Sequence, residues 1–433
     1  MKIFSYKDKN FISKIEYFIN KRNQLNSENN KIEKEVRNII KEVRFKGDNA
    51  LIKFSKKFDG THLTKSTIKL SNDYLRNYKK QIDTDVLNSF KKAIKNVKNF
   101  HKKQLPKNYK IHKKNIEIGS IWKSIESVGL YIPGGSSVYP SSLIMNVIPA
   151  QVAGVRRIVV TTPSQNGKFN PYILALFDLL KIKEVYQIGG AQAVAALAYG
   201  TKTILPVNKI FGPGNAYVTS AKKNVFGKVG IDLMAGPSEI VVVADNKNNP
   251  EWVASDMLAQ AEHDENAQSI LITNSFVFSK KVIENINKLI VKISKKKIVK
   301  KSLKNFGAII VLKNLNTSHS IINLISPEHL HLHNQSRESI IKKVYNAGAI
   351  FIGDYTSESF GDYIVGTNHV LPTSGSARFS SGLGVLDFMK RTSYVKMNKK
   401  SSNILADHVI NMASIESLDA HKLSVKVRQK QKK

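Results

Sequence analysis

The stretch QAEHDE places Gln260 and His263 three positions apart in the chain. Residues at this spacing share one face of an α-helix, so an amide oxygen and an imidazole nitrogen can reach the same ion. Two such ligands are only part of a metal site, and alone they fit a hydrogen-bonded polar cluster equally well. Any further ligands must be His, Asp, Glu or Gln, because the chain contains no cysteine.

A second candidate group lies in SPEHLHLHN, where Glu328 directly precedes His329. The two side chains offer proton-transfer groups with different natural pKa values. If this segment is a strand, His329, His331 and His333 line one face, which suggests a three-histidine metal site. The alternative is that these alternating histidines are exposed at a strand edge.

Two more segments carry side chains that are able to do chemistry. FGDYIVGTNHVLPT contains Asp362 and His369 in a loop rich in Gly, Thr and Asn, as expected where a loop shapes a pocket. ESLDAHK contains Glu416 and His421 near the end of the chain. Neither segment specifies a reaction by itself.

The elements that position these residues change character near residue 116. From there, short apolar runs such as RIVVTTP and EIVVVAD alternate with helical segments such as AQAVAALAYGT. This alternation predicts an α/β protein whose parallel sheets are covered on both faces. Asn170-Pro171 and Asn249-Pro250 each stand between a strand and a helix, and the repeat suggests a duplicated α/β unit.

The flanking regions are expected to be mostly helical. IEKEVRNIIKEVRFKGD has apolar residues at the spacing of one helix face and ends at Gly47. We therefore expect four segments: a helical 1–115 that packs with the first α/β domain, α/β domains at 116–238 and 239–385, and a small helical 386–433.

The net charge of +35 raises the question of nucleic-acid binding. Residues 1–119 hold 30 Lys and Arg against 12 acids, while residues 120–275 hold 12 against 11. Because the lysines are spread along amphipathic helices, a solvated surface is favoured over a nucleic-acid site. No segment is apolar enough for a membrane span or a signal peptide, so a cytoplasmic protein is expected.

The glycine-rich segments invite a phosphate-binding interpretation. GPGNAY begins as G-x-G, but Tyr217 occupies the third-glycine position, so the usual dinucleotide fingerprint is absent. YIPGG and QIGG each follow a strand, where a helix N-terminus can meet a pyrophosphate, and a tight turn is the alternative.

Taken together, LYIPGG, GGAQAVAALAYGT, GPGNAYV, AGPSE, QAEH, PEHL, GDYIVGTNHVLPT and ESLDAHK resemble the histidinol dehydrogenase family, in that family's order over about residues 128 to 425. The resemblance implies oxidation of L-histidinol through L-histidinaldehyde to L-histidine, with reduction of two NAD. It also implies a homodimer with two incomplete Rossmann-like domains, whose NAD site does not need the glycine fingerprint.

The same resemblance assigns roles to individual residues. His329 acts as the base and Glu328 activates water. The implied sets are zinc ligands Gln260, His263, Asp362 and His421, the last crossing from the partner subunit; further substrate contacts Ser238, His369 and Glu416; and NAD contacts Tyr131, Gln192 and Asn215. A zinc-dependent hydrolase that uses Glu328 without NAD is the alternative function.

Overall fold

The structure is a computed structural model that describes residues 1–27, 30–76, 78–113, 115–134, 139–234, 236–334 and 337–429. Its contacts divide the chain into two compact units. The first unit comprises Met1–Gln104 and Ile125–Phe388, and the second comprises Leu105–Ser124 and Met389–Lys433. The four segments expected from the sequence remain a prediction about folding units.

A parallel sheet of five strands forms the core of the first α/β domain. In chain order these strands are β4 (Ser127–Tyr131), β5 (Arg157–Thr161), β6 (Glu184–Tyr186), β7 (Lys209–Phe211) and β8 (Gly230–Ile231). Their order in the sheet is β6-β5-β4-β7-β8, with every pairing parallel. The order reverses between β4 and β7, and such a switch point opens a crevice at the carboxyl ends of the strands.

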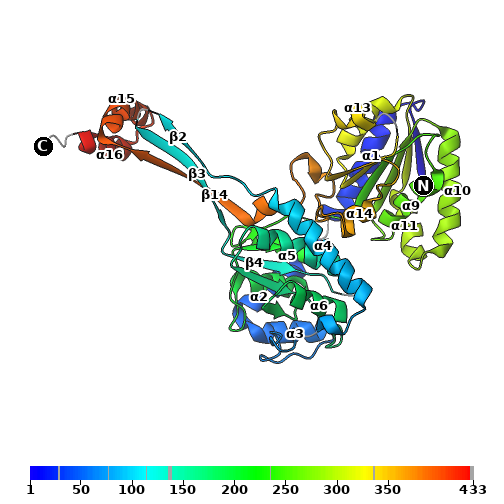
Figure 1. Cartoon of the computed structure of the whole chain (residues 1–433), viewed down its shortest axis with the longest axis horizontal. Coiled ribbons are helices and arrows are strands. Elements are labelled where there is room, and N and C mark those ends of the chain that lie inside the picture. Colours follow the sequence, from blue (N-terminus) through cyan, green and yellow to red (C-terminus); the bar gives the residue numbers. More distant parts are fainter. Residues whose placement is uncertain are drawn as a thin grey trace. The chain divides into compact units, whose positions relative to one another are not determined.

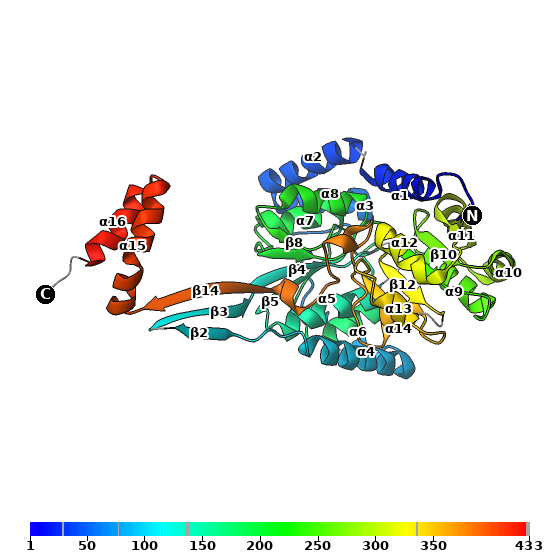
Figure 2. The ribbon, with the colours of Figure 1, turned by 90° about the horizontal axis from the view of Figure 1, so that it is seen from above.

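Helices cover both faces of this sheet. They are α2 (Asn30–Lys46), α3 (Asp48–Asp59), η1 (Tyr78–Lys80), α4 (Thr84–Lys102), α5 (Pro140–Val152), α6 (Pro171–Leu179), α7 (Gly190–Tyr199) and α8 (Ala216–Val225). Figure 2 shows α2, α7 and α8 on one side of the sheet, with α4, α5 and α6 on the other. The apolar stripe predicted on α2 is buried there, at Val36, Ile39, Ile40 and Val43.

The second α/β domain contains a parallel sheet of six strands. They are β1 (Lys2–Ser5), β9 (Glu239–Val243), β10 (Gln268–Thr273), β11 (Ala308–Val311), β12 (His329–Leu332) and β13 (Ala349–Ile352). Their order is β1-β11-β10-β9-β12-β13, with every pairing parallel. The order reverses between β9 and β12.

Two hydrophobic clusters pack against the two faces of this second sheet. The surrounding elements are α1 (Phe11–Ser27), α9 (Pro250–Ala261), α10 (Phe276–Leu289), η2 (Ile290–Lys292), α11 (Lys296–Phe306), η3 (Leu315–Thr317), α12 (Ser318–Ile325), α13 (Arg337–Ile341), α14 (Glu358–Tyr363), η4 (Ser376–Arg378) and η5 (Val385–Phe388). Figure 1 shows α1 and α13 on one side of the strands and α10 on the other.

The sheet orders confirm a duplication but change its alignment. Strands β4 to β8 take the same places in the first sheet as β9 to β13 take in the second. The unit β4–α5–β5 therefore corresponds to β9–α9–β10. The alignment based on the two Asn-Pro dipeptides instead matched β5–α6–β6 with β9–α9–β10. That alignment is therefore shifted by one β–α–β unit. Both dipeptides nevertheless cap their helices, because Asn170 and Asn249 accept hydrogen bonds from backbone N–H groups of the first turn.

The N-terminal region contributes to both α/β domains. Helices α2 and α3 pack with the first sheet, as expected. Strand β1, which the helical prediction did not include, pairs with β11 in the second sheet. Ile15 and Phe18 of α1 are buried in the core of that same sheet. The chain start is thus tied to the domain that carries Glu328 and His329.

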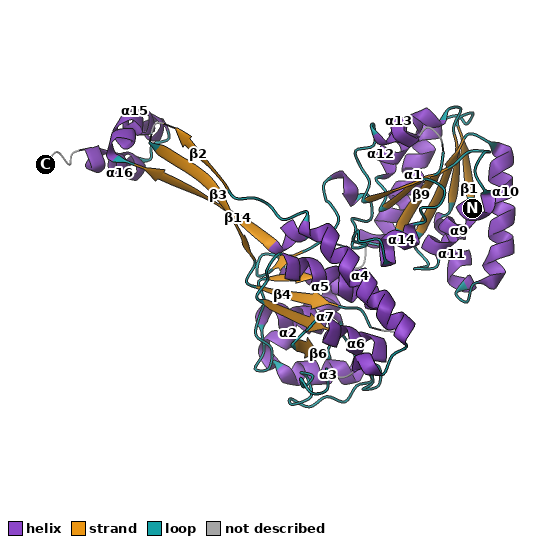
Figure 3. Ribbon diagram, in the orientation of Figure 1, coloured by secondary structure: helices purple, strands orange, loops and turns teal. Residues whose placement is uncertain are grey.

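The second unit is an antiparallel sheet followed by two helices. It contains β2 (Tyr109–Lys113), β3 (Ile116–Ser124), β14 (Met389–Met397), α15 (Lys399–Ile415) and α16 (Asp419–Gln429), with sheet order β14-β3-β2. Figure 3 shows the three strands running toward α15 and α16. The C-terminal helices were predicted, whereas β14 was not. No described helix in either unit is long and apolar enough to cross a membrane.

Candidate functional site

His329, the predicted base, stands at the start of β12. Its Nδ1 lies 3.1 Å from the carbonyl oxygen of Glu239. A carbonyl only accepts, so Nδ1 carries a hydrogen, and in the neutral ring the lone pair lies on Nε2. Nε2 has no hydrogen-bond partner among the described residues and lies 3.5 Å from Oδ1 of Asp362. A buried imidazole with a fixed tautomer and a free nitrogen can accept a proton from a bound substrate.

Glu328 is held by the same backbone unit. Its Oε2 accepts a hydrogen bond of 2.9 Å from the backbone N–H of Glu239. The carboxyl is buried, and burial raises the pKa of Glu328 to about 7. Because this value is close to neutral pH, the group can exchange a proton with water in either direction.

Glu239 connects this pair to the N-terminal helix. Its side chain forms a buried ion pair with Arg22 of α1 and accepts a 2.9 Å hydrogen bond from the backbone N–H of Ser374. Arg22 also donates to the carbonyl oxygens of Pro237, at 2.6 Å, and Asn266, at 3.1 Å. No sequence motif points to Arg22 or Glu239, because Arg22 meets Glu239 217 positions later and Glu239 meets Glu328 and His329 a further 89 and 90 positions along the chain.

The electrostatics around His329 and Asp362 are coupled. Burial alone lowers the pKa of His329, but the carboxylates of Glu328 and Asp362 outweigh it and raise the pKa to about 10. Burial alone raises the pKa of Asp362, but its interaction with His329, together with the charges of His369 and His263, outweighs burial and lowers the pKa. The charges of these side chains therefore favour an imidazolium at His329 beside the carboxylate of Asp362.

The predicted metal ligands on α9 differ in their surroundings. Gln260 is fully buried, as its helix face predicted, yet neither atom of its amide has a hydrogen-bond partner within the described part of the chain. A buried amide without partners is costly, so the interpretation of a satisfied polar cluster is wrong. His263 follows α9 and is accessible to solvent, while the protein packed around its ring lowers its pKa. A lowered pKa favours the neutral imidazole that binds metals.

Asp362 completes the part of the predicted ligand set that lies in the first unit. It is carried by α14, and its charge acts directly on His263. One amide, one imidazole and one carboxylate are nitrogen and oxygen donors that Zn²⁺ accepts. The unpartnered amide of Gln260 fits such a group as well.

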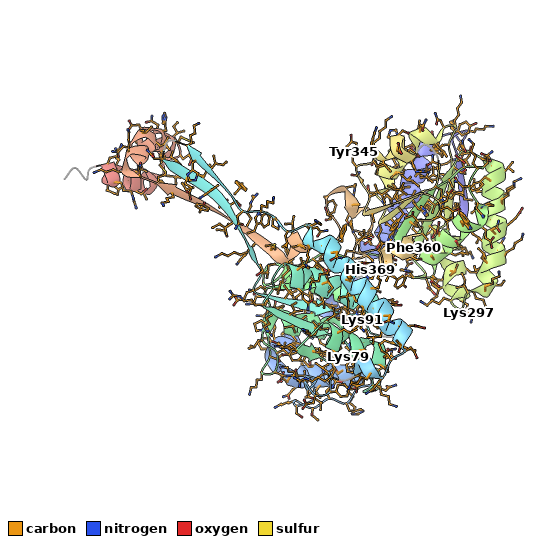
Figure 4. The ribbon with its side chains drawn as sticks, in the orientation of Figure 1. Lys79, Lys91, Lys297, Tyr345, Phe360 and His369 are labelled. Carbon is orange, nitrogen blue, oxygen red and sulfur yellow. The ribbon has the colours of Figure 1, made fainter. Side chains whose placement is uncertain are left out.

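His369 packs against the same helix. Its Nδ1 donates to the backbone carbonyl oxygen of Asp362 at 3.0 Å, and its Nε2 lies 3.4 Å from the hydroxyl of Ser142. Figure 4 shows His369 near Phe360 of α14, the helix that carries Asp362. Ser238 directly precedes β9, and its carbonyl oxygen accepts from Arg22. Both residues thus border the elements that hold Glu328 and His329.

Glu416 and His421 belong to the second unit. Glu416 directly follows α15, and His421 lies on α16. Both side chains are exposed. Their predicted roles, as a substrate contact and as a fourth metal ligand, stay predictions.

The residues predicted to bind NAD lie at the carboxyl edge of the first sheet. Tyr131 ends β4, and its hydroxyl accepts a 3.2 Å hydrogen bond from the backbone N–H of Gly190 at the start of α7. Gln192 is buried in the same helix, and its Nε2 has no partner among the described residues. Asn215 caps α8. The glycines of QIGG therefore begin a helix at the switch point of the sheet, while residue 135 of YIPGG lies outside the described residues.

A glycine keeps this edge open. Gly212 follows β7 with φ of +114°, and a Cβ there would lie 2.0 Å from the carbonyl oxygen of Tyr131. Only glycine allows the chain to pass at this distance. The tyrosine hydroxyl stays protonated, since burial raises the pKa of Tyr131 to about 12.

The alternating histidines of β12 do not form a three-histidine site. His329 faces Asp362, whereas His331 and His333 both approach Asp256 of α9. All three histidines are buried, so their interpretation as exposed strand-edge residues is wrong.

The family to which these residues point is found independently by comparison with known proteins. The family model described as histidinol dehydrogenase matches residues 21–429. Histidinol dehydrogenases of Rhodopseudomonas palustris and Agrobacterium fabrum are 48% and 47% identical, over 89% of this chain and 90% and 89% of theirs. The crystal structure of histidinol dehydrogenase from Elizabethkingia anophelis aligns with a TM-score of 0.92 at 34% identity, covering 99% of this chain and 98% of that one.

Proposed function

Because the chain belongs to the histidinol dehydrogenase family, we propose that it oxidises L-histidinol to L-histidine through L-histidinaldehyde, with reduction of two NAD. The observation that carries this proposal is the pairing of a fixed base with a neutral-range acid. His329 has a free Nε2, and the adjacent Glu328 has a pKa of about 7. The alternative of a zinc-dependent hydrolase finds no support in the family.

In the first oxidation, Nε2 of His329 accepts the proton of the substrate hydroxyl. A hydride leaves the same carbon for the nicotinamide, so the alcohol becomes an aldehyde and one NADH forms. In the second oxidation, Glu328 accepts a proton from water as the water oxygen adds to the aldehyde carbon, and the imidazolium of His329 returns its proton to the aldehyde oxygen, which gives the hydrate. His329 then accepts a hydroxyl proton of the hydrate while a second hydride leaves. The chain has no cysteine, so no thiohemiacetal route is open.

Gln260, His263 and Asp362 hold the metal in this proposal, with His421 of a second copy as the fourth ligand. When bound, zinc anchors nitrogen atoms of the substrate and offsets the carboxylate charge beside His329. The offset matters, because a base with a pKa near 10 is protonated at neutral pH. Residues Ser238, His369 and Glu416 contact the substrate.

NAD occupies the carboxyl edge of the first sheet. The N-termini of α7 and α8 present backbone N–H groups and positive dipole ends there, which favour a pyrophosphate. Tyr131, Gln192 and Asn215 line this edge, and the unpartnered Nε2 of Gln192 is a donor available to the cofactor.

A homodimer is supported by the apolar surface of the second unit. Met412 is 64% exposed, Ile415 85% and Leu423 59%, all on its two helices. Large apolar side chains in such numbers mark a protein interface on a small unit. A second copy of the chain is the partner that would bring His421 and Glu416 to a shared site.

The stoichiometry of NADH formation tests the reaction. We expect two NADH per L-histidinol, loss of activity on chelation, and recovery with Zn²⁺. In Glu328→Gln the aldehyde step should slow far more than the alcohol step, whereas His329→Gln should slow both. One NADH per substrate in the unmodified protein would refute the role of Glu328 in hydration, and none from folded, zinc-loaded protein would refute the proposed function.

A further inference from the structure

We propose that Asp256, His331 and His333 form a second divalent-cation site, separate from the set of Gln260, His263 and Asp362. One ligand atom from each of the three residues lies within 4.8 Å of the other two. Oδ2 of Asp256 is 3.0 Å from Nδ1 of His331 and 3.0 Å from Nε2 of His333. All three side chains are buried, so solvent does not compete for these atoms.

The hydrogen positions at His331 leave a place for a cation. Its Nε2 lies 3.0 Å from the carbonyl oxygen of Gly353, so Nε2 must be the donor. In the neutral ring, Nδ1 then carries a lone pair that faces a carboxylate oxygen. Among the residues that the structure describes, this nitrogen has no hydrogen-bond partner, and the residue is fully buried. Two electron pairs that face each other at this distance are stable only with a positive charge between them.

His333 shows the outer contacts that metal-binding histidines usually make. Its Nδ1 lies 3.1 Å from Oδ1 of Asp354, while Nε2 faces Asp256. Asp354 is held in turn by a 3.0 Å hydrogen bond from the amide of Asn248. Metal-ligating histidines commonly donate their other ring nitrogen to a carbonyl or carboxylate, and both histidines here have such an acceptor.

The donor set indicates the class of ion. Two imidazole nitrogens and one carboxylate oxygen suit Zn²⁺ and similar borderline divalent ions better than Ca²⁺ or Mg²⁺, which prefer oxygen ligands. A water molecule is the natural fourth ligand. The rings of His331 and His333 lie with centroids 3.8 Å apart and planes tilted by 31°, and one nitrogen of each ring lies 3.0 Å from the same oxygen of Asp256.

The site would join α9 to β12. Asp256 lies one helical turn before Gln260, and His331 lies two residues after His329. The cation therefore bridges the helix that carries the predicted catalytic-metal ligands and the strand that begins with the base. Its role is structural, and it stands whether or not the dehydrogenase proposal holds.

Metal counting on the full-length protein tests the proposal. The protein is stripped with a chelator, shown to remain folded by circular dichroism, and titrated with Zn²⁺ in a calorimeter. We expect two equivalents per chain, one in His331→Gln, one in His263→Gln and none in the double variant. His101→Gln removes another fully buried histidine and serves as the matched control, with two equivalents expected.

A variant-independent measurement covers the case that His331→Gln does not fold. Anomalous scattering at the zinc edge, from crystals of the unmodified protein, should show a peak among Asp256, His331 and His333. No peak there, or two equivalents retained in folded His331→Gln, would overturn the second site and favour a protonated imidazole in its place. Retention of two equivalents in His263→Gln alone would count instead against the proposed catalytic metal site.

Discussion

Replacing Arg22 by Met should weaken both the fold and the catalytic pair. The Arg22 side chain is 2% exposed and the Glu239 side chain 4% exposed, so the variant leaves a buried carboxylate without its counter-ion. Breaking a buried pair from one side costs about 3–5 kcal/mol, and the carbonyl oxygens of Pro237 and Asn266 also lose a donor. We therefore expect a loss of about 3–5 kcal/mol in the free energy of unfolding, measured by urea denaturation.

The same change should reach the chemistry through Glu239. Its N–H holds Glu328 and its carbonyl holds His329, so movement of this backbone displaces both groups. Because misplacement by about 1 Å can cost up to about 100-fold in rate, kcat of the folded variant should fall about 10- to 100-fold for both oxidation steps. Stopped-flow measurement of NADH with histidinol and with histidinaldehyde gives the two rates.

Arg157→Met is the matched control. Arg157 pairs with Glu184 at 2.9 Å, but their side chains are 22% and 26% exposed and lie in the first α/β domain. A partly exposed pair contributes about 0–1 kcal/mol, and kcat should not change. The double variant Arg22→Met/Glu239→Gln should recover part of the stability, since it removes the isolated charge. If Arg22→Met lost no more stability than Arg157→Met and kept its kcat, the reasoning about Glu239 would be refuted.

Two further predictions concern NAD and pH. Gln192→Met should raise KM for NAD by about 2- to 10-fold without changing kcat at saturating NAD, because one hydrogen-bond donor to the cofactor is lost. In the control Gln187→Met, whose native amide donates to Thr67 instead, KM for NAD should stay constant. Equal effects in both variants would exclude a specific contact between Gln192 and NAD. The rate of histidinaldehyde oxidation should increase by about tenfold for each unit that the pH is raised toward 7, and it should level off above pH 7. The reason is that Glu328 accepts a proton only when ionised, and its pKa is about 7. A pH profile of Glu328→Gln with the same rising limb would assign the titration to another group.

Elements whose signal is local were predictable from the sequence. The buried stripe of α2 follows the 3.6-residue period, and the apolar runs of β5 and β9 identify strands buried on both faces. Strand β1 was not predictable, because four residues gain their structure only by pairing with β11, some 300 positions away. The same holds for β14, where Met389 pairs with Ser124.

The candidate site divides in the same way. The spacing of Gln260 on α9 predicted its burial, but only the structure shows that its amide lacks a partner. Glu239 was invisible because it works through its backbone and because its counter-ion, Arg22, lies in a lysine-rich region with no motif. Asp256 was overlooked because the histidines it meets come from a strand 75 positions later.

Five strands have the same order in the two sheets, yet the predicted site residues lie at opposite ends of the strands. At the first sheet, Tyr131 and the starts of α7 and α8 lie at the carboxyl edge, where open α/β sheets usually bind ligands. At the second sheet, His329 and Glu239 lie at the amino ends of β12 and β9, while His333 and Asp354 lie beyond the carboxyl ends of β12 and β13. The cluster of Asp256, His331 and His333 thus reaches the carboxyl end of β12, the end at which open α/β sheets usually bind ligands.

This arrangement gives the cluster a mechanical consequence. Strand β12 is only four residues long, so a cation fixed at His331 and His333 would also fix the backbone of His329. His331→Gln should therefore leave KM for NAD unchanged, since Tyr131 belongs to the other sheet, while protease cleavage near β12 becomes faster. Unchanged proteolysis of metal-loaded His331→Gln would mean that hydrogen bonds alone hold β12 against α9.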